Sequence, residues 1–97
     1  MFNVLLHPDA EREFREAFIW YEHQRLGLGK DFLFSIDEAI ERILQSPEAF
    51  PVIRKGIRRV VVRRFPFEIF YEPAPEEIRV IAIFHSSRDP KTWHSRK

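Results

Sequence analysis

The apolar residues of this chain change their spacing once, in a loop between residues 46 and 56. Before that loop they recur every three or four positions, which is the spacing of one face of an α-helix. After it they fall in runs rich in valine, isoleucine and phenylalanine that alternate as strands do. A chain with helices first and strands afterwards predicts an α+β domain, in which helices cover one face of a mainly antiparallel sheet.

The helical spacing is present in two segments. We expect a first helix to begin at Pro8, with His7 as its N-cap, and to end between Gln24 and Gly27, where glycines interrupt the pattern. A second helix is expected over 30–45 and should end before the Ser-Pro pair that follows it. Because the turn between them is short, the two helices should form an antiparallel hairpin.

Four strands are expected around this hairpin. One precedes it, at 1–6, and three follow it, at 57–64, 67–72 and 78–84. The predicted order is therefore β-α-α-β-β-β, with a four-stranded sheet. The chain shows no internal repeat, and its 97 residues suit a single domain spanning 1–97.

Alternation along the strands assigns side chains to the two faces of the sheet. We expect the purely apolar sets beneath the helices and the mixed sets on the open face. On the open face Arg63 and Glu68 should lie close together, and His85 should approach them if the last strand pairs with the one before it. The expected helix-facing set is Val60, Val62, Phe67, Ile69, Tyr71, Ile78, Val80, Ala82 and Phe84. The expected open-face apolar residues are Val61, Phe70 and Ile83.

Composition excludes several classes of function. The chain has no cysteine, which removes disulfides, thiolate catalysis and cysteine-based zinc sites and favours a cytoplasmic location. No apolar run is long enough to span a membrane and none resembles a signal peptide, so no membrane partner is expected. Since His7, His23 and His94 lack partners at metal-ligand spacing, we expect no metal site and no cofactor.

The net charge is only +1, but the charges are unevenly distributed. Six Arg or Lys and no acid lie between Arg54 and Arg64, whereas the helical region carries most of the acids. We therefore take Arg54, Arg58 and Arg59 as candidate contacts for an acidic or extended segment of a partner. The alternative is that they form a solvated edge that discourages strand addition.

The order and spacing of these segments resemble the RelE/ParE superfamily of toxins from type II toxin–antitoxin systems, and the ParE branch most. The resemblance depends on HPDAEREFREAFIWYE and FLFSIDEAIERILQSPEAFP as the two helices, FPFEIFY as a strand, and VIAIFHSSRDPKTW as the last strand and tail. It implies a toxin that inhibits DNA gyrase, as in modules that stabilise plasmids. It also implies neutralisation by a cognate antitoxin in a hetero-oligomer.

Two alternative functions stay open. RelE-like members are ribosome-dependent endonucleases that cut mRNA, and some superfamily nucleases use a Glu, an Arg and a His. Here Glu68, Arg63 and His85 could supply the base, cation and acid that phosphodiester cleavage needs. Many RelE-like sequences, however, have arginine at the position of Glu68, so the sequence leaves open whether the chain is an enzyme. The third hypothesis is a degenerate, non-toxic binding module.

Simpler roles compete with the functional ones. Arg63 and Glu68 could form a solvated cross-strand ion pair, worth about 0–1 kcal/mol. His85 could be a strand-end residue with a backbone partner. Trp93 could fold back as a lid over the core, or it could contact a partner together with Arg88 of the same tail.

Overall fold

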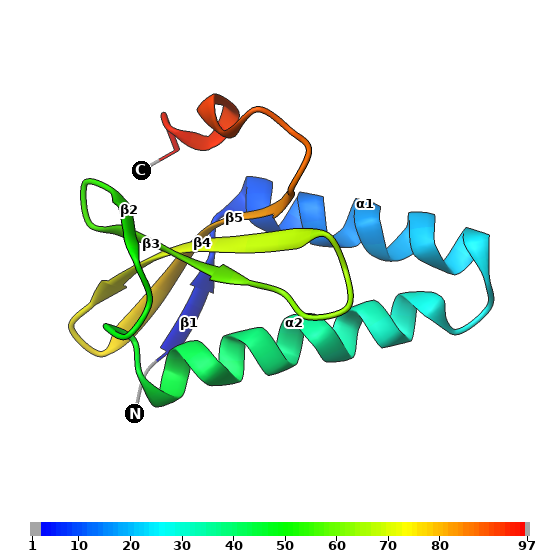
Figure 1. Cartoon of the computed structure of the whole chain (residues 1–97), viewed down its shortest axis with the longest axis horizontal. Helices are drawn as coiled ribbons and strands as arrows, with labels where there is room; N and C mark the ends of the chain where they lie inside the picture. The colour runs from blue at the N-terminus through cyan, green and yellow to red at the C-terminus, as the bar shows by residue number, and fades with distance from the viewer. Residues whose placement is uncertain (1–2, 97) are drawn as a thin grey trace.

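The computed structural model describes residues 3–96, which form a five-stranded sheet with two helices on one face (Figure 1). The elements in chain order are β1 (Asn3–Leu6), α1 (Pro8–Gln24), α2 (Leu28–Gln45), β2 (Val52–Arg54), β3 (Ile57–Val61), β4 (Phe67–Ala74), β5 (Glu77–His85) and the 3-10 turn η1 (Pro90–Trp93). The α+β class and the succession of strand, helical hairpin and strands are confirmed. Residues 1 and 2 of the first predicted strand lie outside the described residues.

The start of α1 follows the prediction, whereas α2 starts earlier than predicted. His7 Nδ1 accepts a hydrogen bond from the N–H of Asp9 at 3.0 Å, so this side chain caps α1. At the start of α2 the Glu22 carboxylate accepts hydrogen bonds from the N–H groups of Gly27 and Gly29, each at 2.9 Å. This carboxylate from α1 satisfies two free donors, which allows α2 to begin at Leu28.

The sheet has one more strand than predicted and is mixed. Its order is β1-β5-β4-β3-β2, with β1 parallel to β5 and the other neighbours antiparallel. The additional strand is β2, which lies in the predicted loop and is joined to β3 by a tight turn at Lys55 and Gly56, with φ of 44° and 82°. A strand of three residues is too short to give an alternation signal.

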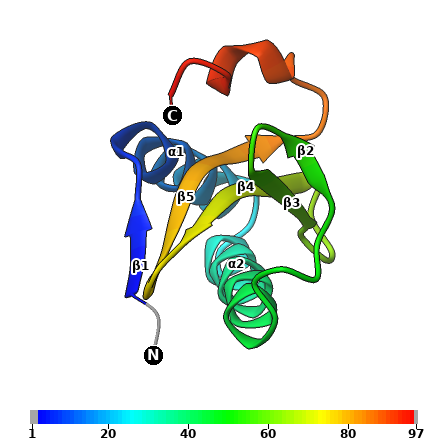
Figure 2. The ribbon, with the colours of Figure 1, turned by 90° about the vertical axis from the view of Figure 1, so that its left-hand side faces the viewer.

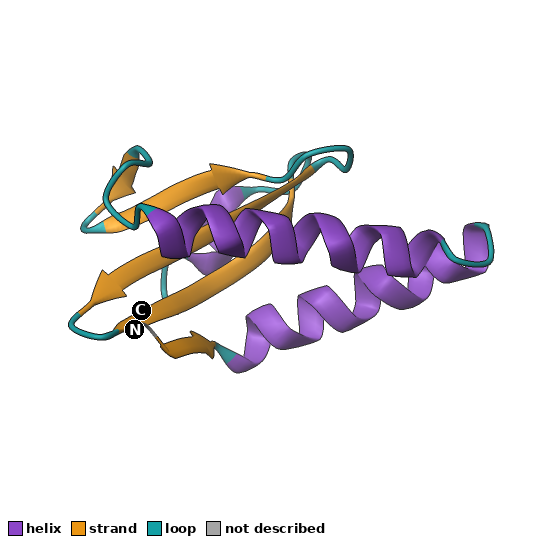
Figure 3. Ribbon diagram, turned by 90° about the horizontal axis from the view of Figure 1, so that it is seen from below, coloured by secondary structure: helices purple, strands orange, loops and turns teal. Residues whose placement is uncertain are grey.

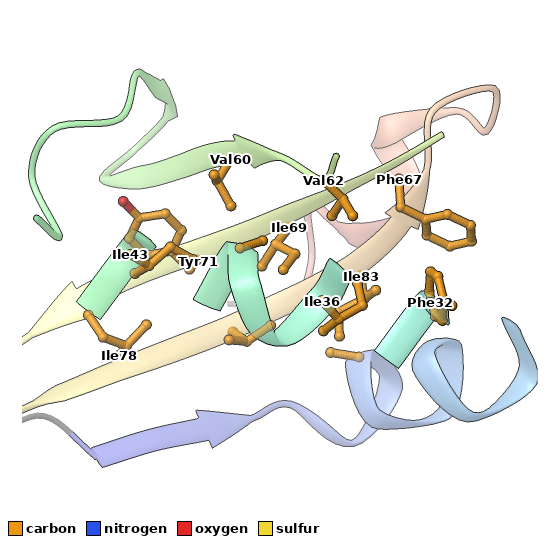
Figure 4. Close-up of a cluster of buried hydrophobic side chains, with 13 residues drawn as sticks. Phe32, Ile36, Ile43, Val60, Val62, Phe67, Ile69, Tyr71, Ile78 and Ile83 are labelled. Atoms are coloured by element: carbon orange, nitrogen blue, oxygen red, sulfur yellow. The ribbon is translucent and has the colours of Figure 1, made fainter. Parts of the chain in front are cut away.

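The main core lies between the sheet and the two helices, which cross beneath it (Figure 3). Phe32, Ile36 and Ile43 of α2 point towards the sheet (Figure 4). The strands supply the residues that alternation assigned to this face, namely Val60, Val62, Phe67, Ile69, Tyr71, Ile78 and Val80. The faces predicted for the side chains of these residues, from Val60 to Val80, are therefore confirmed.

A β-bulge in β5 changes the register of its second half. Phe70 of β4 pairs with Ala82, but Tyr71 pairs with Val80, so Ile81 is an extra residue with no partner of its own on β4. One extra residue reverses the alternation of every side chain that follows it.

The predicted faces of the residues after the bulge are consequently wrong. Ile83 joins the core beneath the helices, and His85 lies against the ring of Phe67 at 5.2 Å between ring centroids. Ala82 and Phe84 turn to the opposite face. Because all residues from 80 to 84 are apolar, the sequence contains no alternation there from which the bulge could be recognised.

The C-terminal tail covers the other face of the sheet (Figure 2). Trp93 is fully buried and stacks on Phe70, with ring centroids 4.3 Å apart. Ile57, Ile81, Ala82 and Phe84 complete this second cluster. The prediction that Trp93 folds back as a lid is confirmed. Over residues 3–96 no helix is long and apolar enough to cross a membrane, and no group of three side chains could hold a metal ion.

Candidate functional site

Basic residues of the β2–β3 hairpin meet the tail at a pocket of about 310 Å³, which we call the basic pocket. It lies on the tail side of the sheet, where Phe70 and Trp93 form its apolar wall. Its polar residues come from β2, β3, β4 and the tail. The full lining is Ile53, Arg54, Arg59, Glu68, Phe70, Pro90, Trp93 and His94.

The basic pocket has more hydrogen-bond donors than acceptors. Within residues 3–96 the guanidinium of Arg54 has no ion pair, and that of Arg59 reaches only Glu68, at 3.9 Å. The indole Nε1 of Trp93 is buried and has no hydrogen-bond partner in that part of the chain. Glu68 is the pocket's one carboxylate, so the lining suits an acceptor-rich or anionic group.

The three residues predicted to form a catalytic group do not lie together. Arg63 pairs with Glu38 of α2 at 3.0 Å, and Glu68 pairs with Arg59 instead. His85 lies on the helix side of the sheet because of the bulge in β5, and its Nδ1 accepts a hydrogen bond from the N–H of Ser87 at 3.1 Å. The predicted proximity of Arg63, Glu68 and His85 is therefore wrong. His85 instead has the simpler of its two expected roles, that of a residue at the end of a strand with a backbone partner.

Arg58 differs from the other predicted partner contacts because its side chain holds a loop. Its guanidinium donates hydrogen bonds to the carbonyl oxygens of Glu48 and Phe50, at 3.0 and 2.7 Å. Tyr71 fixes the same loop by donating a hydrogen bond to the carbonyl of Pro47 at 2.7 Å, and burial raises the pKa of Tyr71 to about 12. The loop that follows α2 is thus tied to the sheet at three carbonyl groups.

The two tail residues predicted as partner contacts are also engaged within the chain. Trp93 is fully buried, so it has no surface to offer while the tail stays in place. Arg88 lies over the ring of Phe84 at 4.4 Å and 3.6 Å from a carboxylate oxygen of Glu13, but about half of its side chain is exposed. Of the predicted contacts, Arg54, Arg59 and Arg88 keep exposed charge.

A family profile described as "ParE toxin of type II toxin-antitoxin system, parDE" matches residues 4–90. The chain belongs to the ParE toxin family. Toxin ParE2 of Mycobacterium tuberculosis, in two strains, is 27% identical over 89 residues, which cover 91% of this chain and 85% of the relative. A solved structure described as "Chromosomal ParDE TA system from P. aeruginosa" has a TM-score of 0.75 at 17% identity, covering 88% and 96% of the two chains. That structure shows the shared fold.

The match to the ParE family ends at residue 90, so Trp93, His94 and Arg96 lie beyond it. Of the residues that line the basic pocket, Trp93 and His94 therefore lie outside the matched range, and the other six lie inside it.

A buried ion pair that the sequence analysis missed fastens this tail. The guanidinium of Arg96 binds both carboxylate oxygens of Glu13, at 2.9 and 2.7 Å, and both side chains are almost completely buried. Glu13 also accepts the N–H of Ile83, and Arg96 donates to the carbonyl of Ile81. The pair thus supplies hydrogen-bond partners for backbone groups of β5 at Ile81 and Ile83, which lie past the last residue that pairs with β1. The sequence contains one sign of this pair. Glu13 stands three residues after Ala10, so a charged residue lies on the apolar stripe of α1 and needs a buried partner.

Proposed function

We propose that this ParE family member is a toxin that inhibits DNA gyrase in the cytoplasm and that a cognate antitoxin neutralises it. The family match over residues 4–90 carries the proposal. The solved neighbour comes from a ParDE toxin–antitoxin system, which supports an antitoxin as the partner of this chain. The toxin would act by binding, with no bond made or broken by its own side chains.

The basic pocket is the surface that best suits such a target. Arg54 and Arg59 present charge without a close acidic partner. Long-range attraction between these cations and an acidic surface, or DNA phosphates held by gyrase, would speed association. Rim charges of this kind affect the association rate and its salt dependence more than they affect stability.

Purified protein should block supercoiling by gyrase and trap cleaved DNA on the enzyme. The Arg54→Ala, Arg59→Ala double variant should weaken this inhibition about tenfold. Arg15→Ala is the control, because Arg15 is an exposed arginine on α1, outside the basic pocket, and makes only a surface pair with Glu11. Intact supercoiling at a stoichiometric excess of folded protein would refute gyrase as the target.

Antitoxin binding is tested separately. Expression of the chain alone should arrest growth, and co-expression of the cognate antitoxin should restore growth and yield a purifiable complex. Normal growth of cells expressing the folded chain alone would instead favour a degenerate, non-toxic binding module.

One observation favours a second candidate, the ribosome-dependent mRNA endonuclease. The basic pocket combines a carboxylate, a guanidinium and an imidazole, in Glu68, Arg59 and His94, which are the group types that phosphodiester cleavage needs. Transcript cuts in a translating extract that disappear in Glu68→Ala and His94→Ala, but persist in His85→Ala, would establish this activity. Unchanged transcripts in the presence of the wild-type protein would remove it.

A further inference from the structure

A pocket of about 420 Å³ lies on the helix side of the sheet, whereas the basic pocket lies on the tail side. We call it the aromatic pocket. Three elements form it, namely α1, the turn that follows β3, and the paired strand ends where Phe67 begins β4 and His85 ends β5. Its volume falls in the range of sites that hold a small ligand. The lining is Ala17, Trp20, Tyr21, Pro66, Phe67 and His85.

Rings make up most of this wall, and one of them is open to solvent. The side chain of Trp20 is 58% exposed and meets Tyr21 edge to face, with ring centroids 5.2 Å apart. Behind it Tyr21 contacts Phe67 at 6.2 Å, and Phe67 contacts His85 at 5.2 Å. Tryptophan usually buries most of its surface in a folded protein. An open indole at the mouth of a pocket of rings is therefore a platform on which another flat ring can stack.

His85 offers a hydrogen-bond donor to the aromatic pocket. Its Nδ1 accepts a hydrogen bond from the N–H of Ser87 at 3.1 Å. Because an amide N–H can only donate, this Nδ1 carries no hydrogen, and the neutral ring carries its hydrogen on Nε2. Within residues 3–96 this Nε2 has no hydrogen-bond partner. A ligand that enters the pocket should therefore carry an acceptor.

Two exposed arginines flank the aromatic pocket. Arg64 lies two residues before Pro66 on the turn that follows β3, and Arg25 lies one helical turn after Tyr21. Both guanidiniums reach the same carboxylate, that of Asp31, at 4.0 and 3.1 Å. One carboxylate shared by two guanidiniums leaves a net positive charge at this end of the molecule. Guanidinium groups bind phosphate oxygens well, so this charge suits a phosphate.

We propose that the aromatic pocket binds an unpaired base of single-stranded nucleic acid, either DNA or RNA. The base stacks on Trp20, one of its acceptors takes the Nε2 hydrogen of His85, and the adjoining phosphates lie near Arg64 and Arg25. Aromatic stacking beside a basic track is how proteins commonly hold single strands. The pocket itself is independent of the proposed function, whereas DNA held by gyrase as the source of the base rests on it.

Two other kinds of ligand fit the aromatic pocket less well. A cationic ligand would meet the donor of His85 inside the pocket and the guanidiniums outside it. A peptide segment would bring amide N–H groups, and none of the six lining side chains has a carboxylate or an amide oxygen to accept them. A base combines a flat ring, acceptors at its edge and an attached phosphate, so it matches all three features.

The test measures the anisotropy of a labelled single-stranded oligothymidylate of about eight nucleotides as the protein is added. The Trp20→Ala variant should bind about tenfold more weakly, because stacking of the base is lost. The matched control is Phe34→Ala, since Phe34 is an aromatic residue of α2 that is 64% exposed and lies outside the pocket. Its affinity should stay within about twofold of the wild type. Thermal melts establish that both variants are folded.

Two further variants separate the hydrogen bond from the charge. His85→Phe keeps a ring but removes the donor, and it should weaken binding about threefold. Arg64→Gln should reduce the slope of log affinity against log salt by about 0.7, the value for one phosphate contact on a single strand. Arg15→Gln should leave this slope unchanged, because Arg15 lies on α1 outside the pocket.

Intrinsic fluorescence gives a measurement that needs no variant. The chain has two tryptophans, of which Trp20 is exposed and Trp93 is fully buried. Quenching of the emission by unlabelled oligothymidylate would therefore report a base at Trp20. Oligouridylate of the same length is the second probe, and the tighter binder of the two identifies DNA or RNA as the source of the base. A DNA duplex of the same length should bind at least about tenfold more weakly, because its bases are already stacked.

Three results would overturn the inference. The first is that neither oligonucleotide binds, including the case in which an acidic peptide with an aromatic residue quenches Trp20 instead. The second is equal affinity of Trp20→Ala and Phe34→Ala. The third is binding that survives Trp20→Ala but is lost in the Arg54→Ala, Arg59→Ala double variant, which would place the nucleic acid in the basic pocket.

The same proteins distinguish this inference from the proposed function. If wild-type protein inhibits gyrase but binds neither oligonucleotide, the aromatic pocket is not a base site and the gyrase proposal stands. If it binds a single strand through Trp20 but leaves supercoiling intact, the inference stands and gyrase is not the target.

Discussion

The two faces of this sheet are buried in different ways. The helix face is covered by α1 and α2, elements of 17 and 18 residues whose apolar stripes recur turn after turn. The tail face is covered by an irregular segment with one short turn, η1, of four residues. Its cover depends mainly on one large ring, Trp93, and on the buried ion pair between Glu13 and Arg96.

Stability is therefore expected on the helix face of the molecule and adaptability on the tail face. Burial on the helix face is distributed over many side chains, so it should be lost only on global unfolding. On the tail face a few contacts hold a terminal segment, and such segments can open without unfolding the rest of the domain. The basic pocket is formed partly by this tail, so a partner could find the pocket in more than one shape.

The largest effect is expected for Phe32→Ala on the helix face. The ring of Phe32 is fully buried and contacts the rings of Phe14, Tyr21, Phe65 and Phe67. Its loss should lower the free energy of unfolding by about 3–5 kcal/mol, because a cavity remains between helices and sheet. Urea denaturation measures this change. Trp93→Ala removes an even larger ring from the tail face and should cost less; an equal or greater cost would remove the distinction between the faces.

The next effect is expected at the ion pair that fastens the tail. Arg96→Ala leaves the Glu13 carboxylate buried, but that carboxylate keeps the N–H of Ile83 and has Arg88 at 3.6 Å. We therefore expect a loss of about 3 kcal/mol, at the low end for breaking a buried pair. Urea denaturation measures the loss, and faster amide exchange in the tail than in the helices would show that the tail opens first.

The matched control is Arg12→Ala, because Arg12 pairs with Asp9 on the same helix but at the surface. That pair lowers the pKa of Asp9 through its hydrogen bond, yet an exposed pair contributes little to the free energy of unfolding because water screens it. If Arg96→Ala costs no more than Arg12→Ala, the ion pair does not hold the tail.

The two faces also differ in how far the sequence predicts them. Helical spacing and strand alternation predicted most of the helix face, since each buried residue there belongs to a repeating pattern. The pattern failed after Val80, because a bulge inside an uninterrupted apolar run changes the face of a side chain without changing its residue type. This event placed His85 on the opposite face of the sheet from Glu68, whereas Arg63 is separated from Glu68 because it pairs with Glu38 of α2.

The tail face could be predicted only in part. Trp93 was expected as a lid because a lone large ring in a polar tail rarely stays in water. The Glu13–Arg96 pair joins residues that are 83 positions apart, and neither strand alternation nor helical spacing specifies a partner at that distance. Similarly, the position of β1 at an edge of the sheet depends on the order of the strands, which the alternation of side chains does not specify.

A smaller, pH-dependent effect is expected at Tyr71, which lies on the helix face. Burial raises the pKa of its phenol from 10.0 to about 12. Since the folded pKa lies above the unfolded one, this contribution is complete below pH 10 and is lost as the pH rises towards 12. We expect wild type to lose about 2 kcal/mol more than Tyr71→Phe over this interval. Denaturation at pH 9 and pH 11.5 measures the difference. Parallel losses in the two proteins would contradict it.

The smallest effect on stability is expected for Glu68→Ala, on the tail face. Glu68 reaches Arg59 only at 3.9 Å, and both side chains are partly exposed, so the pair should contribute less than about 1 kcal/mol. The matched variant is Glu38→Ala, since Glu38 lies 3.0 Å from both Arg42 and Arg63 and should contribute more. Urea denaturation of both variants tests this order. A loss of unfolding free energy above about 2 kcal/mol for Glu68→Ala would show that Glu68 stabilises the fold. A negligible loss would show that its carboxylate is available for contact with a partner.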